Sequence, residues 1–79
     1  MMRENENLID RITIEPGKMG GQPCIRGLRM RVVDVLDLLA SGMSRAEILE
    51  DYPDIEDADL SAALTYAAHT LGKKTIVAA

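Results

Sequence analysis

Apolar side chains recur at helical spacing through residues 32–71, and only short turns interrupt them, so this part of the chain predicts three packed helices. The first segment, residues 32–41, carries its apolar residues on one helical face and is followed by Gly42, a typical residue after a helix end. That face comprises Val32, Val35, Leu36, Leu39 and Met43.

The second and third helical segments open with the same local pattern: apolar residue, cap, any residue, Ala, acid, apolar residue. It occurs at residues 43–48, where Ser44 and Glu47 form a capping box, and again at 55–60, where Glu56 is the cap. Proline at position 53 ends the second segment, because the residue before proline avoids helical geometry. We therefore expect helices from about 44 to 51 and from 57 to 71.

The segment before these helices predicts extended structure. Residues 10–16 alternate, with Ile12 and Ile14 on the side expected to be half-buried, and residues 23–26 can form a second short strand. Glycines separate the two stretches, so residues 10–31 are expected to form a β-hairpin or arm.

A chain of 79 residues with 3% aromatic residues allows one small domain with an aliphatic, alanine-containing core. The predicted fold is mainly α: a three-helix, homeodomain-like helix-turn-helix bundle over residues 32–71 with an N-terminal β-arm. The single domain spans residues 10–71, with a disordered N-terminus at 1–9 and a tail at 72–79. Because a two-stranded arm is rarely stable alone, we expect the arm to pair across a homodimer.

Charge is distributed unevenly along the chain. The net charge is -4, yet residues 11–31 hold five basic residues and one acid, whereas residues 32–59 hold nine acids and one arginine. A basic arm on an acidic body makes the arm the candidate binding segment for a protein or nucleic-acid partner. Its basic residues are Arg11, Lys18, Arg26, Arg29 and Arg31.

Three uses of these basic residues remain open. They can contact carboxylates of a protein partner, they can contact phosphates of a nucleic acid, or they can pair with the chain's own Asp34 and Asp37 or with the acids of a second copy in a dimer.

Nothing in the sequence resembles a catalytic constellation, so we expect a protein that is not an enzyme and uses no metal or cofactor. Cys24 is the only cysteine and is interpreted as a small buried residue, and His69 is the only histidine and is expected on the surface near a helix end. The acids of the second half are interpreted as a solvated face with first-turn helix acids. They are Glu47, Glu50, Asp51, Asp54, Glu56, Asp57 and Asp59.

The third helix is expected to bury one face and present the other to a protein. The expected inward residues are Leu60, Ala63, Leu64, Ala67 and Leu71. The expected interface residues are Ala58, Ser61, Ala62 and Thr65. Since the outward side has no Arg, Lys, Asn or Gln, it lacks the side chains that read base edges.

The stretches "PGKMGGQPCIRGLRMRV" and "VLDLLASGMSRAEILEDYPDIEDADLSAALTYA" resemble the bacterial domain of unknown function family 433, small antitoxin-type proteins with a homeodomain-like core. The resemblance implies a protein that binds and neutralises a PIN-like ribonuclease toxin and also autoregulates transcription. The sequence departs from the family pattern at Leu28, Arg31 and Glu56, which affects the arm and the third helix cap but not the helical core.

Two alternatives to the antitoxin function remain: a DNA-binding regulator that acts through the arginine arm, and a structural protein-interaction domain. A single cysteine, a polar N-terminus and no apolar run of spanning length lead us to expect a cytoplasmic protein without membrane contact.

Overall fold

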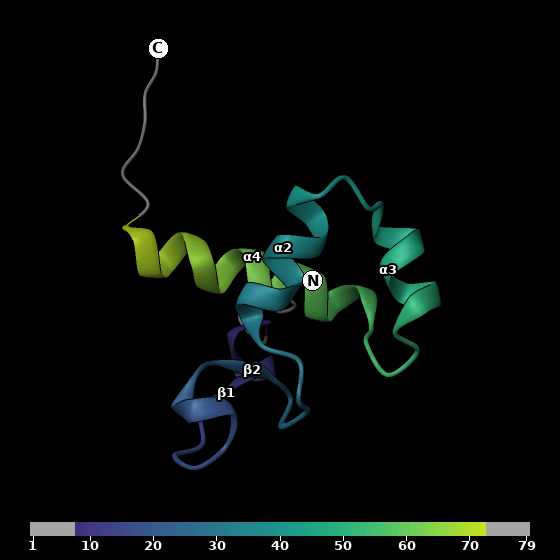
Figure 1. Cartoon of the computed structure of the whole chain (residues 1–79). Coiled ribbons are helices and arrows are strands. Elements are labelled where there is room, and N and C mark those ends of the chain that lie inside the picture. The colour runs from purple at the N-terminus through teal and green to yellow at the C-terminus, as the bar shows by residue number, and fades with distance from the viewer. Residues whose placement is uncertain (1–7, 73–79) are drawn as a thin grey trace.

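The computed structural model describes residues 8–72, which form three α-helices and a small two-stranded antiparallel sheet (Figure 1). The arm contains a 3-10 helix η1 (Ile9–Arg11), strand β1 (Ile12–Thr13), a 3-10 turn η2 (Met19–Gly21) and strand β2 (Cys24–Ile25). The helices are α2 (Val32–Ala40), α3 (Arg45–Asp51) and α4 (Asp57–Leu71). The mainly helical fold with an N-terminal hairpin is thereby confirmed.

The helix ends agree with the capping signals in the sequence. The Ser44 side chain accepts a hydrogen bond from the amide of Glu47 at 3.1 Å, and the Glu47 carboxylate accepts one from the amide of Ser44 at 2.8 Å. Helix α3 ends at Asp51, just before Tyr52 and its following proline, and α4 ends at the left-handed Gly72.

The sheet is shorter than the alternation at residues 10–16 predicts. Only Ile12 pairs with Ile25 and Thr13 with Cys24, because Arg11 belongs to η1, and Ile14 is 56% exposed rather than half-buried. Ordered structure already includes Ile9, so it begins before the predicted boundary at residue 10. The predictions for residues 1–7 and 73–79 lie outside the described residues.

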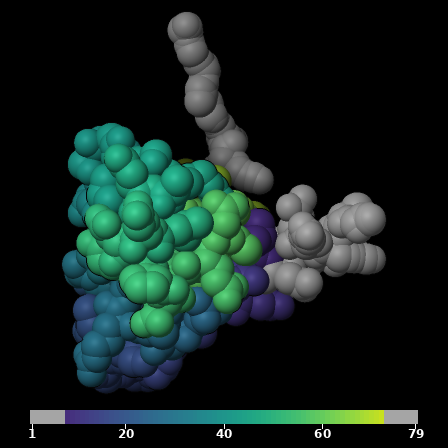
Figure 2. All heavy atoms as spheres, turned by 90° about the vertical axis from the view of Figure 1, so that its right-hand side faces the viewer, coloured from purple at the N-terminus to yellow at the C-terminus, as the bar shows by residue number. Residues whose placement is uncertain are grey.

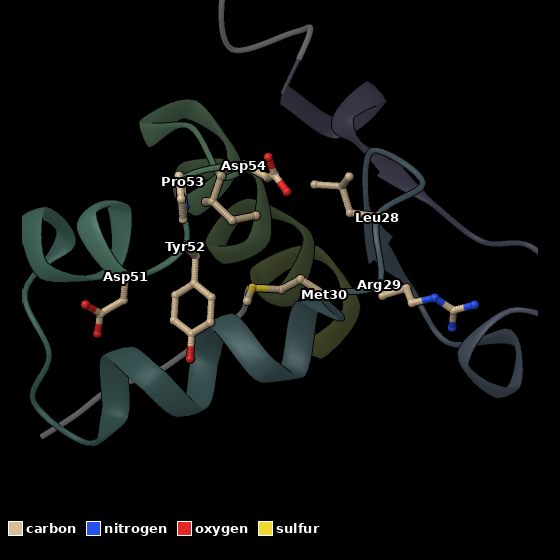
Figure 3. Close-up of a pocket in the computed structure, with 8 residues that line it drawn as sticks. Leu28, Arg29, Met30, Asp51, Tyr52, Pro53 and Asp54 are labelled. Carbon is tan, nitrogen blue, oxygen red and sulfur yellow. The ribbon is translucent and has the colours of Figure 1, made fainter.

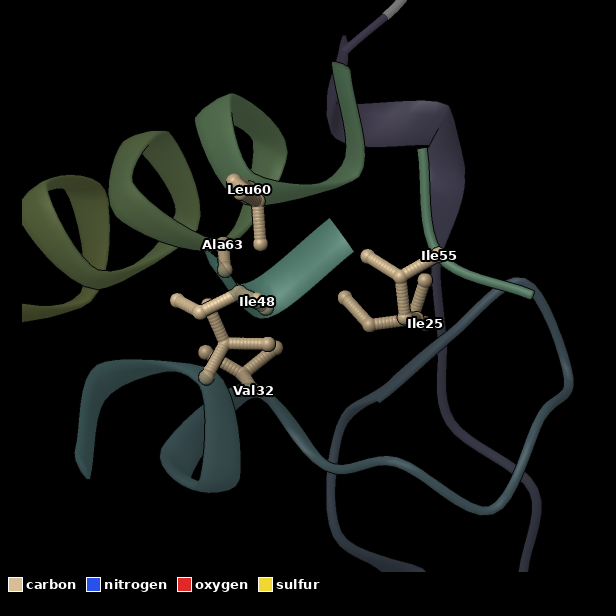
Figure 4. Packing of buried hydrophobic residues seen from close by; sticks show 7 residues of the cluster. Ile25, Val32, Ile48, Ile55, Leu60 and Ala63 are labelled. Carbon is tan, nitrogen blue, oxygen red and sulfur yellow. The ribbon is translucent and has the colours of Figure 1, made fainter. Parts of the chain in front are cut away.

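The hydrophobic core joins the arm to the helices (Figure 4). Its buried residues come from β2, from all three helices and from the turn before α4: Ile25, Val32, Val35, Ile48, Ile55, Leu60 and Ala63. Figure 4 shows Ile25 of the arm beside Ile55 of the turn before α4. Cys24 is also buried, as predicted.

The burial of α4 differs from the predicted pattern. Leu60 and Ala63 are buried as expected, but Leu64 is 43% exposed and Leu71 is 85% exposed. Length accounts for Leu71: fifteen residues of helix span about 22 Å, whereas the nine residues of α2 against it span only about 14 Å. The last turns of α4 therefore extend past the core (Figure 1). Leu64 lies within that length and is exposed because it points about 100° around the helix from the buried Ala63.

A pair of leucines one turn apart in α4 tests this burial pattern. Leu60→Ala is expected to lower the free energy of unfolding by about 3 kcal/mol, because it removes a fully buried side chain and leaves a cavity. Leu64→Ala, the matched control, is expected to change it by less than about 1 kcal/mol. Urea denaturation followed by circular dichroism measures both, and equal losses would contradict the burial described.

Candidate functional site

The five basic residues predicted as a binding arm do not form one free surface. Arg11, Arg26 and Arg31 each make hydrogen bonds with carboxylates of the chain itself. The sequence left open whether these cations serve a partner or internal pairing. For these three arginines the structure shows internal pairing.

The Asp59 carboxylate, in the first turn of α4, is where the arm and the bundle meet. It is fully buried, and it accepts hydrogen bonds from Arg11 at 2.8 Å and from Arg26 at 2.8 and 3.0 Å. It also accepts a bond from the backbone amide of Glu56 at 2.8 Å, which closes the capping box of α4. Figure 2 shows η1 packed directly against the start of α4, where this cluster lies.

The interpretation of Asp59 as a solvated first-turn acid is therefore wrong. Burial alone raises the pKa of Asp59, but the hydrogen bonds from Arg26, the Glu56 amide and Arg11 outweigh it and hold the pKa below its usual value. A signal was present in the sequence: helical spacing places Asp59 one turn before Ala63, which was expected to face inward and is buried. An acid among small buried residues requires a cationic partner, and the arm holds the excess of cations.

The backbone places Arg26 in position for this contact. Arg26 and Gly27 have φ of 43° and 73° and form a tight turn, in which the Leu28 amide donates to the Ile25 carbonyl at 2.7 Å. A left-handed arginine costs about 1 kcal/mol relative to the right-handed region. The paired carboxylate of Asp59, together with a 2.7 Å bond from Arg26 Nη2 to the Asp54 carbonyl, offsets that cost.

Arg31 and Lys18 also have partners within the chain. Arg31 lies at the N-cap of α2 and contacts Asp34 through two side-chain nitrogens at 2.7 and 3.1 Å. The hydrogen bond from Arg31 lowers the pKa of Asp34. The ammonium of Lys18 donates to the carbonyl of Gly27 and lies 3.9 Å from a Glu15 oxygen.

Arg29 differs from the other arginines of the arm. Within residues 8–72, its only hydrogen bond is from Nη1 to the sulfur of Met19 at 3.8 Å, and it forms no ion pair there. Of the candidate arm arginines, Arg29 is thus the one whose charge is left for a ligand or partner.

The predicted interface residues of α4 occupy different environments. Ala62 is fully buried, so its assignment to an interface is wrong. The arm contacts α4 through η1 and β1, so the side of α4 that was expected to face outward is covered at Ala62. Ser61 accepts a 2.8 Å hydrogen bond from Arg45, which also pairs with Asp57 at 2.9 Å. Ala58, Ser61 and Thr65 are half-buried, which leaves little open surface at this place.

An exposed apolar surface lies instead on the second half of α4. Leu64, Ala68 and Leu71 are exposed there and Ala67 is half-buried. These four residues follow helical spacing, and we call them the α4 stripe. Beside the stripe, a cavity of about 230 Å³ separates α4 from the start of α2 and the arm. Its lining is almost entirely apolar: Pro23, Val32, Val33, Leu36, Tyr66, Ala67 and Leu71, with Gln22 and Thr70.

The described residues bring together ion pairs and apolar grooves. Within residues 8–72, no three His, Cys, Asp or Glu side chains gather as metal ligands, and Cys24 and His69 lie in different elements. No helix in that range is long and apolar enough to cross a membrane.

Two aspartates in the first turn of α4 test the Asp59 cluster. Asp59→Asn is expected to lower the free energy of unfolding by about 3 kcal/mol, because two part-buried arginines lose their charged partner. Asp57→Asn is the control and is expected to change it little, since Asp57 is 64% exposed. Thermal unfolding measures both, and similar effects of the two substitutions would contradict the buried cluster.

Acid should weaken the fold through the same carboxylate. Because the pKa of Asp59 is lower in the folded than in the unfolded chain, its stabilisation is complete above about pH 4, the unfolded pKa, and is lost as the pH falls through the folded pKa. The lowered pKa values of Asp34 and Asp57 act in the same direction. Urea denaturation between about pH 6 and pH 2 should show this decline, with a shallower slope for Asp59→Asn. An unfolding free energy that rises on acidification would contradict the assignment.

Comparison with known proteins places this fold among uncharacterised relatives. Residues 12–67 match the family described as "Protein of unknown function (DUF433)". The uncharacterized protein y4eO of Sinorhizobium fredii (strain NBRC 101917 / NGR234) is 36% identical over 56 residues, which are 71% of this chain. The chain spans only 25% of the length of that relative.

A solved structure has the same fold. The crystal structure of a DUF433 member protein from Anabaena variabilis ATCC 29413 superimposes with a TM-score of 0.75 at 32% sequence identity. The alignment covers 91% of this chain and 71% of the other. Since the matched residues include both strands, α2, α3 and most of α4, this chain belongs to the DUF433 family.

Proposed function

We propose that this protein is an antitoxin-like, non-enzymatic module that binds and neutralises a PIN-like ribonuclease toxin. The toxin itself is suggested by the family resemblance of the sequence. The observation that carries protein binding is the α4 stripe, which exposes Leu64 by 43% and Leu71 by 85% beside an apolar cavity. Contiguous exposed apolar surface of this kind marks protein-interaction sites.

Arg29 supplies a charge that suits such a partner. A metal-dependent nuclease gathers carboxylates around its metal, and a guanidinium can pair with a carboxylate through two hydrogen bonds. In this proposal Arg29 takes the role that the sequence assigned to the whole arm, because Arg11, Arg26 and Arg31 already pair with Asp59 and Asp34.

Nucleic-acid binding has less support, and autoregulation through the arm depends on it. Contact with phosphates would require Arg11 and Arg26 to leave the buried carboxylate of Asp59. At the start of α4, the position of a recognition helix, Arg11 and Arg45 are already paired with Glu56 and Asp57, so these cations are engaged by carboxylates rather than left for phosphate.

The homodimer expected from the sequence needs a different basis. The sequence predicted a dimer because a two-stranded arm is rarely stable alone. In the structure the chain itself supports the arm, since β2 contributes Ile25 to the core. A second copy of the chain is therefore the competing occupant of the α4 stripe.

Co-expression with a PIN-like protein encoded beside this chain tests the proposal. The tagged wild-type chain should retain that protein on an affinity column and inhibit its ribonuclease activity. Leu64→Ser/Leu71→Ser should weaken binding by about tenfold or more, because it removes two exposed anchors. Ile14→Ser removes an aliphatic side chain that is 56% exposed in the arm, and this control should bind as the wild type does.

Light scattering on the same variants distinguishes the two candidate occupants of the stripe, the nuclease and a second copy of the chain. A wild-type monomer that binds the nuclease agrees with the proposal. A dimer that dissociates on substitution of Leu64 and Leu71, with nuclease binding unchanged, would assign the stripe to self-association and contradict its proposed role.

A further inference from the structure

A second groove lies at the opposite end of α4 from the apolar stripe. A cavity of about 320 Å³ separates the arm at Leu28–Met30 from the end of α3 and the turn that follows it, residues 51–55 (Figure 3). A hollow of about 350 Å³ shares Arg29, Met30 and Tyr52 with it and extends along α2. We call the two together the acidic groove.

The floor of the acidic groove is apolar. Leu28, Met30 and Leu38 pack against the hydrophobic core, and Ile55 belongs to it. Tyr52 remains 37% exposed, and Figure 3 shows its ring beside the sulfur of Met30. Methionine beside an aromatic ring makes a surface that adapts to different side chains.

Carboxylates surround this floor. Asp34, Asp37, Asp51 and Asp54 line the groove from α2, the end of α3 and the following turn. Asp34 is neutralised by Arg31, but within residues 8–72 the side chains of Asp37, Asp51 and Asp54 have no ion pair or hydrogen bond. Among the described residues, Arg29 is the one cation of the lining, and in Figure 3 its guanidinium points away from Tyr52.

This combination selects the chemistry of the occupant. A nucleic acid would meet three unpaired negative charges, and no cluster of metal ligands gathers within residues 8–72. Lysine and arginine fit both features, because their aliphatic stems can lie on the apolar floor while the charged ends reach the carboxylates. We propose that the acidic groove binds a basic segment of a partner protein, in which lysine or arginine alternates with aliphatic residues.

The inference deepens the proposed function, since it rests on the chain binding a protein. The groove lies at the N-terminal end of α4 and the stripe on its C-terminal half. A partner that occupies both would place a basic segment at the groove and an apolar contact at the stripe.

Titration of the full chain with a short peptide tests the groove directly. The probe is acetyl-KLRLK-amide and the control peptide is acetyl-ELQLE-amide, each followed by amide chemical shifts of the 15N-labelled protein. The basic peptide should shift the resonances of Met30, Tyr52 and Ile55, and its affinity should fall as salt rises from about 50 to about 300 mM. The acidic peptide should cause no shift at these residues.

Two double variants with equal changes in charge complete the test. Asp51→Asn/Asp54→Asn should weaken the basic peptide about tenfold, because it removes two unpaired charges of the groove. Glu50→Gln/Asp10→Asn neutralises two exposed acids outside the groove and should bind within about twofold of the wild type. The Asp54 carbonyl that receives Arg26 is backbone and is unchanged by the first variant.

The outcomes separate the groove from the proposed function. Equal binding of both peptides, an unaffected Asp51→Asn/Asp54→Asn variant, or shifts on the α4 stripe instead would overturn the groove assignment. So would concentration-dependent shifts at Tyr52 in the peptide-free protein, since they would identify a second copy of the chain as the occupant. Failure to retain the nuclease with normal peptide binding would reject the toxin proposal and leave the groove standing.

Discussion

The structure depends on one buried carboxylate. Asp59 lies in the first turn of α4, has no solvent exposure, and is held by Arg11, Arg26 and the amide of Glu56. A buried charge is tolerated only when it is paired and fully hydrogen bonded, so neither the arm nor α4 can move away from the other at low cost. The ion cluster thereby makes the arm part of the folded domain, and Ile25 completes its core.

Because the arm pairs with Asp59, most of its positive charge is not free to bind a partner. The sequence shows a basic segment in front of an acidic body, and such polarity suggests an arm that reaches outward. In the structure the two halves neutralise each other where they meet. Within residues 8–72, the charges that remain for recognition include Arg29 and the carboxylates of the acidic groove, and the exposed apolar surface includes the α4 stripe.

Local signals in the sequence predicted the helices well, because their causes are local. The capping box at Ser44, the stop before the proline at position 53 and the end of α4 at Gly72 each depend on residues within one turn. The sequence did not predict the pairing of Arg26 with Asp59, 33 residues apart, nor the exposure of Leu64. Both depend on which elements pack together and on which side, and helical periodicity alone does not contain that information.

Native-state hydrogen exchange tests most directly whether the arm is an integral part of the domain. The Ile25 amide donates to the Met30 carbonyl at 2.9 Å and the Arg26 amide to the Arg11 carbonyl at 2.7 Å, all within the arm. If Asp59 holds the arm in place, these amides will exchange with the same opening free energy as the core amides of α4, such as that of Ala63. Exchange of the arm amides at a much lower opening free energy, independent of denaturant, would show that the arm opens alone and would contradict this account.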